Sequence, residues 1–122
     1  METPANNRSL FERAALFAAD YRDAVGHAAA ALPYADTRLA FDMPTPQSGA
    51  CAADVIDDLV MRSTPGLRAM TGPRFFGWVI GASHPVGVVA DWLTAAWGQN
   101  AGNHEASPAA AAAETVAAKW LE

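Results

Sequence analysis

Apolar residues recur at helical spacing in the first quarter of the chain, and this predicts a helix over residues 9–32. Ser9 and Glu12 form a capping-box pair, in which each side chain satisfies a backbone N–H left free at the start of a helix. Pro33 is predicted to end the helix. The apolar stripe, with members three or four positions apart, comprises Leu10, Ala14, Phe17, Tyr21 and Val25.

Three further segments carry helical patterns. Residues 51–63 form the first, with acidic residues early and Arg62 late, as the helix dipole favours. Residues 83–100 form the second, with Pro85 in the first turn and apolar residues around most of the circumference, which predicts burial on several sides. The third starts with Ser107 as N-cap and Pro108 at the first position. The apolar face of 51–63 comprises Val55, Ile56, Leu59 and Val60.

The segments between these helices lack a helical period. Residues 33–49 contain three prolines and predict an extended connector. Residues 64–73 are rich in turn formers, and the run RFFGWVIG at 74–81 is short and β-prone. The chain as it stands is therefore predicted to be all-α, with about four helices joined by extended connectors.

Composition narrows the classes of partner. The formal charge is −5, and the eight basic residues are scattered, which argues against nucleic acid and anionic membranes. No apolar run is long enough to span a bilayer, and Cys51 is the single cysteine, so we expect a cytoplasmic protein. The 29 alanines bury little area each, so we expect the chain to be weakly stabilised on its own.

No catalytic constellation is evident in the sequence. His27, His84 and His104 lack the spacing of metal ligands, and no metal site is predicted. The acidic residues of 51–63 are interpreted as a solvated helix face. Lys119 is the only lysine and is interpreted as a surface residue. The last helical pattern reaches the final residue without a stop signal, which suggests that a longer fold continues beyond it.

The motifs from Pro73 to Leu121 resemble a known family. The elements are GPRFFGW, the small-residue turn GASHP, QNAG leading to ASPAA, an acidic residue at Glu114 and a Trp-Leu pair. Together with DMPTPQSGACAADVIDDL and STPGL upstream, they resemble the early part of the pyridoxal-phosphate-dependent group II amino-acid decarboxylases. The chain would then be the N-terminal segment of a fold type I enzyme whose α/β large domain is missing.

The resemblance implies that the two parts of the chain have different roles. Residues 1–71 would form a helical dimerisation segment lying on a second copy of the chain, and residues 72–122 would begin the truncated large domain. The complete homodimer would use pyridoxal phosphate to decarboxylate an L-amino acid. We expect no cofactor bound covalently to this segment and no activity from it alone.

The resemblance also implies site residues. Four would line the substrate pocket and two would approach the site of the other subunit. Gly81 carries no hydroxyl for a substrate carboxylate, so no particular amino acid is predicted. Trp78 is the favoured pocket residue because its glycine neighbours let a ligand approach, whereas the other aromatics fit core or dimer packing. The six residues are Trp78, Val79, Ile80 and Gly81, then Asn100 and Gly102.

A second interpretation belongs to a different class. The chain could be a stand-alone helical association module whose apolar face binds a partner chain without catalysis. We also expect self-association, because a contiguous apolar surface from Phe75 to Trp97 would be larger than the apolar patches that soluble monomers usually expose. In particular, Phe17 and Tyr21 are expected to pack against another chain more than against their own.

Overall fold

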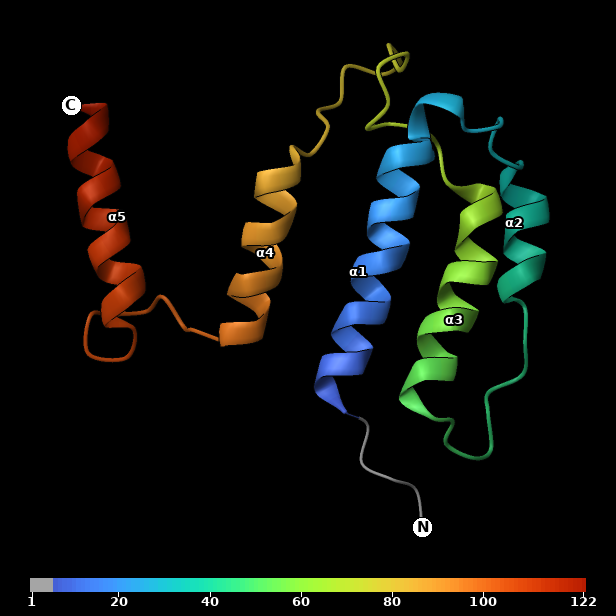
Figure 1. Ribbon diagram of the computed structural model, residues 1–122, viewed down its shortest axis with the longest axis horizontal. Coiled ribbons are helices and arrows are strands. Elements are labelled where there is room, and N and C mark those ends of the chain that lie inside the picture. Colours follow the sequence, from blue (N-terminus) through green and yellow to red (C-terminus); the bar gives the residue numbers. More distant parts are fainter. Residues whose placement is uncertain (1–5) are drawn as a thin grey trace. The chain divides into compact units, whose positions relative to one another are not determined.

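The computed structural model describes residues 6–122, and all regular structure in them is helical (Figure 1). Within this range no strand forms, which confirms the prediction of an all-α chain. The chain divides into two compact units, one up to Ala82 and one from Ser83 to Glu122. The elements are α1 (Asn7–Ala24), η1 (Val25–His27), α2 (Tyr34–Phe41), α3 (Ala52–Ser63), η2 (Thr64–Gly66), α4 (Pro85–Trp97) and α5 (Pro108–Leu121).

Helix α1 begins and ends earlier than predicted. Asn6 is the N-cap, and its side-chain oxygen accepts from the Arg8 N–H at 3.0 Å, so the capping box at Ser9 is wrong. The helix gives way to η1 at Val25, and residues 28–32 are not helical. Tertiary hydrogen bonds compensate: the Leu32 N–H donates to the Pro65 carbonyl at 2.8 Å.

Helix α2 lies where the sequence predicted an extended connector. Pro33 is the residue before its first turn, a position where a proline does not interrupt helical hydrogen bonding. The Thr37 hydroxyl donates to the Pro33 carbonyl at 3.1 Å, and Arg38 pairs with Asp42 at 3.3 Å one turn later. The prolines of this segment therefore flank a helix instead of excluding one.

Helix α3 begins one residue later than predicted, with Cys51 as its N-cap, and ends at Ser63 as predicted. It lies between α1 and α2 (Figure 1). Two of its acidic residues make contacts, so the solvated face predicted for them is wrong in part. Asp57 accepts two hydrogen bonds from the guanidinium of Arg13 on α1. Asp58 accepts from Arg62 at 2.6 Å, and Arg62 also donates to the Ala40 carbonyl of α2.

These hydrogen bonds change the ionisation of both acids. The bond from Arg13 lowers the pKa of Asp57, and the bond from Arg62 lowers the pKa of Asp58. All four side chains are accessible to water, which screens their attraction. The contacts between helices are therefore the Arg13–Asp57 pair, which links α1 to α3, and the hydrogen bond from Arg62 to the Ala40 carbonyl, which links α3 to α2.

The apolar stripe of α1 faces its own unit. Its first four members are half-buried, and Val25 is 8% exposed and lies beneath Gly72. Val25 is the only buried apolar residue of the described chain. The predicted stripe is therefore confirmed, but the core that it forms is minimal.

The β-prone run at 74–81 does not form a strand, because no neighbouring strand in the described residues offers backbone partners. Instead it turns at Trp78 and Val79, whose φ angles are +64° and +52°. These values lie in the left-handed region, where a β-branched residue such as Val79 is a rare outlier.

The second unit consists of α4 and α5, joined by residues 98–107. His84 caps α4 by accepting from the Val86 N–H at 3.3 Å, and Gly98 ends it in the left-handed conformation with φ +58°. The two helices, both fully described, make no close backbone contact and stand apart (Figure 1). Because its apolar residues are exposed, α4 does not meet the expectation of burial on several sides; these are Val86, Val89, Trp92, Leu93 and Trp97.

In residues 6–122 no helix has the length and apolar character needed to cross a membrane.

Candidate functional site

The four predicted pocket residues form an exposed turn at the end of the first unit. Trp78 is 73% exposed, and the Val79 side chain has no cover at all. Ile80 is also exposed, and a side chain added at Gly81 would meet open space. The segment is accessible to a ligand, but in this chain it forms a turn and not a walled pocket.

Arg68 is the side chain that contacts this turn. Its guanidinium carbon lies 5.4 Å from the centroid of the Trp78 ring, within range of a cation–π attraction. The Arg68 carbonyl accepts from the Tyr21 hydroxyl at 3.2 Å, which ties the start of the segment to α1. The sequence did not single out Arg68, because one arginine in a turn-rich link carries no recognisable motif.

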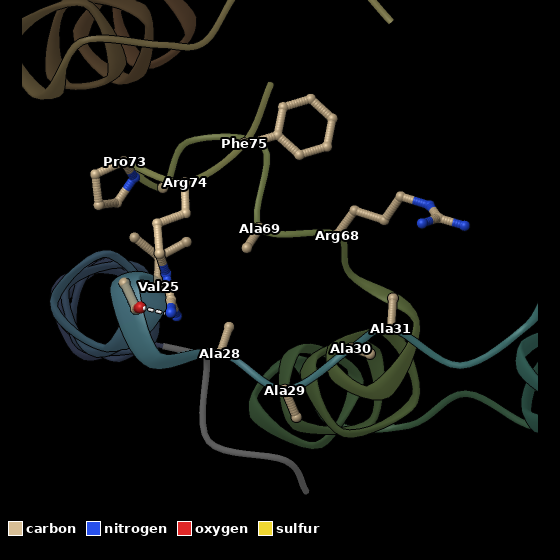
Figure 2. A pocket seen from close by; sticks show the side chains of 12 residues that line it. Val25, Ala28, Ala29, Ala30, Ala31, Arg68, Ala69, Pro73, Arg74 and Phe75 are labelled. Carbon is tan, nitrogen blue, oxygen red and sulfur yellow. Dashed lines mark hydrogen bonds between the residues drawn. The ribbon is translucent and has the colours of Figure 1, made fainter. Parts of the chain in front are cut away.

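A groove of about 420 Å³ lies between residues 25–31 and residues 68–75 (Figure 2). Its floor is a run of alanines, and its walls include Pro73 and Phe75. Arg74 follows one wall and donates to the Gly26 carbonyl at 2.6 Å, while the Arg68 side chain extends away from the hollow (Figure 2). The groove therefore offers shape and small apolar contacts, with its one inward cation already engaged.

The other two predicted site residues lie together in the second unit. The side-chain oxygen of Asn100 accepts from the Gly102 N–H at 3.0 Å, and the Asn100 carbonyl accepts from the Ser107 hydroxyl at 2.6 Å. Ser107 is completely buried, and Asn103 caps the next turn through Glu105 and Ala106. The loop 98–107 is thus held by hydrogen bonds among its own residues.

Ser107 departs from its predicted role. It occupies the N-cap position of α5, but its side chain makes no capping hydrogen bond and binds the Asn100 carbonyl instead. Pro108 at the first helical position lacks the N–H that the helix start would leave free. The serine is consequently available to close the loop.

Among residues 6–122, no group of histidine, cysteine and acidic side chains could hold a metal ion. Lys119 is exposed in the last turn of α5. A lysine that forms a Schiff base is usually buried away from water, and Lys119 does not fit that requirement.

Comparisons with known proteins found no match to this chain. No family model, no curated protein and no solved structure matches it.

Proposed function

We propose that this chain is the N-terminal segment of a pyridoxal-phosphate-dependent L-amino-acid decarboxylase. It contributes part of the dimer interface and part of the substrate pocket. The sequence resemblance from Pro73 to Leu121 carries this proposal. The exposure of the apolar residues of α4 agrees with it, since in a complete enzyme further protein would cover them.

The turn and the loop have the properties that such a role requires. The turn carries the largely exposed Trp78 ring close to Gly81, where a ligand meets no side chain. In the loop, the Asn100 side chain binds the Gly102 N–H and the Asn100 carbonyl binds the Ser107 hydroxyl. A second copy of the chain and an L-amino acid are the partners proposed for these surfaces.

The cofactor would be held by residues outside this segment. Pyridoxal phosphate supplies an electron sink for the carbanion formed when carbon dioxide leaves. Because Lys119 is exposed in the last turn of α5, no catalytic step is assigned to the residues of this chain. Treatment with pyridoxal phosphate and borohydride should label Lys119 no more than an exposed lysine, and stoichiometric specific labelling would contradict that assignment.

Reading the gene beyond codon 122 is the first test. An open reading frame that continues into a histidine–lysine pair supports the decarboxylase. A stop codon at that point favours the alternative, a helical association module without catalysis, which the exposed apolar face of α4 also fits.

The second test uses Trp78→Ala and Gly81→Val in the complete enzyme. Burying an aromatic side chain is worth about 1.5–3 kcal/mol, so Trp78→Ala should raise the KM for the amino acid about ten- to a hundredfold. Gly81→Val should block substrate binding without unfolding, because open space surrounds Gly81 in this chain. Unchanged KM values with a lowered Tm would show that both positions serve packing.

A further inference from the structure

The conformation of the segment 75–81 conflicts with its sequence. Its aromatic and β-branched residues favour extended backbone, yet Trp78 and Val79 both have positive φ. Each left-handed residue that carries a Cβ is disfavoured by about five- to thirtyfold relative to its ordinary conformations. Such a turn usually places asparagine and glycine at these two positions.

The surroundings do little to hold this conformation. Strained residues normally persist where dense packing enforces them. Here Phe76, Trp78 and Val79 are all largely or wholly exposed. Among the described residues, the one specific contact of the turn is the stack of Arg68 on the Trp78 ring, at 5.4 Å.

Arg68 is positioned to hold the turn through its contact with the Trp78 ring, which we call the clip. Its backbone is anchored to α1 through the Tyr21 hydroxyl, so its position is set by the folded helices and not by the turn. Its guanidinium has no carboxylate partner in the described chain, which leaves the Trp78 ring as its contact. An exposed cation–π contact raises the population of the turn a few-fold. This factor is smaller than the factor by which two left-handed residues disfavour the turn.

We propose that residues 75–81 form a two-state strap. In one state Arg68 clips Trp78 and the backbone turns at Trp78 and Val79. In the other the clip opens, both residues adopt extended φ angles, and the Trp78 ring is free to contact a ligand or partner. The link to a substrate pocket rests on the proposed function, but the two states themselves do not.

The test is solution NMR on this chain, without amino acid or cofactor. The intraresidue NOE between amide and Hα protons is strong only at positive φ, and Cα shifts give an independent measure. In the wild-type chain both observables at Trp78 should be averages weighted towards the extended state, because the strain outweighs the Arg68 contact. Val79→Gly should raise the ratio of turn to extended state about five- to tenfold, because glycine adopts positive φ freely.

Arg68→Gln should change the ratio in the opposite sense, by about two- to fivefold, because it removes the cation. Arg38→Gln is the matched control, since that arginine pairs with Asp42 on α2, and it should leave Trp78 unchanged. A turn that is fully populated and insensitive to Arg68→Gln would overturn the proposal. So would an absence of positive-φ signals in both the wild type and Val79→Gly. Neither result involves activity, so a failure here is distinct from a failure of the decarboxylase proposal.

Discussion

Both units of this chain are built from α-helices, but the helices contact one another in the first unit and not in the second. In the first, α3 contacts α1 and α2, and side chains from one helix bind groups of another. In the second, α4 is the more apolar helix, yet it leaves its large side chains in water. Order in the second unit resides in the loop 98–107, through Ser107 and Asn103.

This difference shows that apolar content alone does not produce a core. Helix α3 carries several charged residues and still packs against its neighbours, because Asp57 binds Arg13 of α1 and Arg62 binds the Ala40 carbonyl of α2. Helix α4 has no counterpart against which to bury Trp92 or Trp97 within its own unit. A partner surface, and not a better helix, is what α4 lacks.

The largest effect should come from Gly66→Ala in the first unit. A Cβ at this position would lie 2.5 Å from the Thr37 methyl, so α2 must move away from η2. We expect a loss of about 1–3 kcal/mol, seen as faster amide exchange in α2 and α3. Adding Thr37→Ala removes the closest atoms and should restore more than half of the protection. Unchanged exchange in Gly66→Ala would mean that α2 is not docked on this turn.

Ser107→Ala should have a smaller and local effect in the second unit. It removes the hydroxyl that binds the Asn100 carbonyl, a contribution of about 1 kcal/mol. Amides of the loop, including Gly102 and Ala106, should then exchange faster while those of α4 stay unchanged. Thr115→Ala is the control, because that hydroxyl bonds only within α5. Equal exchange in both variants would show that the loop is ordered by its asparagines alone.

Gly87→Ala should stabilise α4. Open space surrounds this helical glycine, so the added methyl meets nothing, and replacing glycine in a helix gains about 0.5–1 kcal/mol. Circular dichroism should therefore show slightly more helix at a given temperature. The same glycine-to-alanine change thus has opposite signs in the two units, and a loss of helix in Gly87→Ala would reveal a close neighbour at this face.

The smallest effect concerns acid. The pKa values of Asp57 and Asp58 are lowered in the folded state, so their contribution is present above their unfolded pKa and is lost as the pH falls through the folded pKa. Below about pH 4 the first unit should lose stability slightly. The second unit has the exposed His104–Glu105 pair in place of an arginine–aspartate pair, so it should lose less. Amide exchange against pH tests this, and Asp57→Asn should flatten the profile of the first unit. An equal acid response in both units would contradict it.

Local sequence signals determined much of the helical framework. The apolar stripe of α1, the end of α3, Pro85 at the start of α4 and Pro108 at the start of α5 were all readable, because propensity, capping and periodicity act over a few residues. Among the site residues, the proximity of Asn100 and Gly102 also follows from short-range bonding.

The tertiary structure decided the rest. Helix α1 ends early because the residues that follow it bind distant parts of the chain. The Gly26 carbonyl accepts from Arg74, 48 residues away, and the Leu32 N–H donates to the Pro65 carbonyl. The prolines around α2 gave no sign that Arg62 would bind the Ala40 carbonyl at its far end. The β-prone run became a turn because a strand needs a partner strand, and propensity cannot supply one. The contact of Arg68 with Trp78 likewise required the two residues to be brought together by the folded chain.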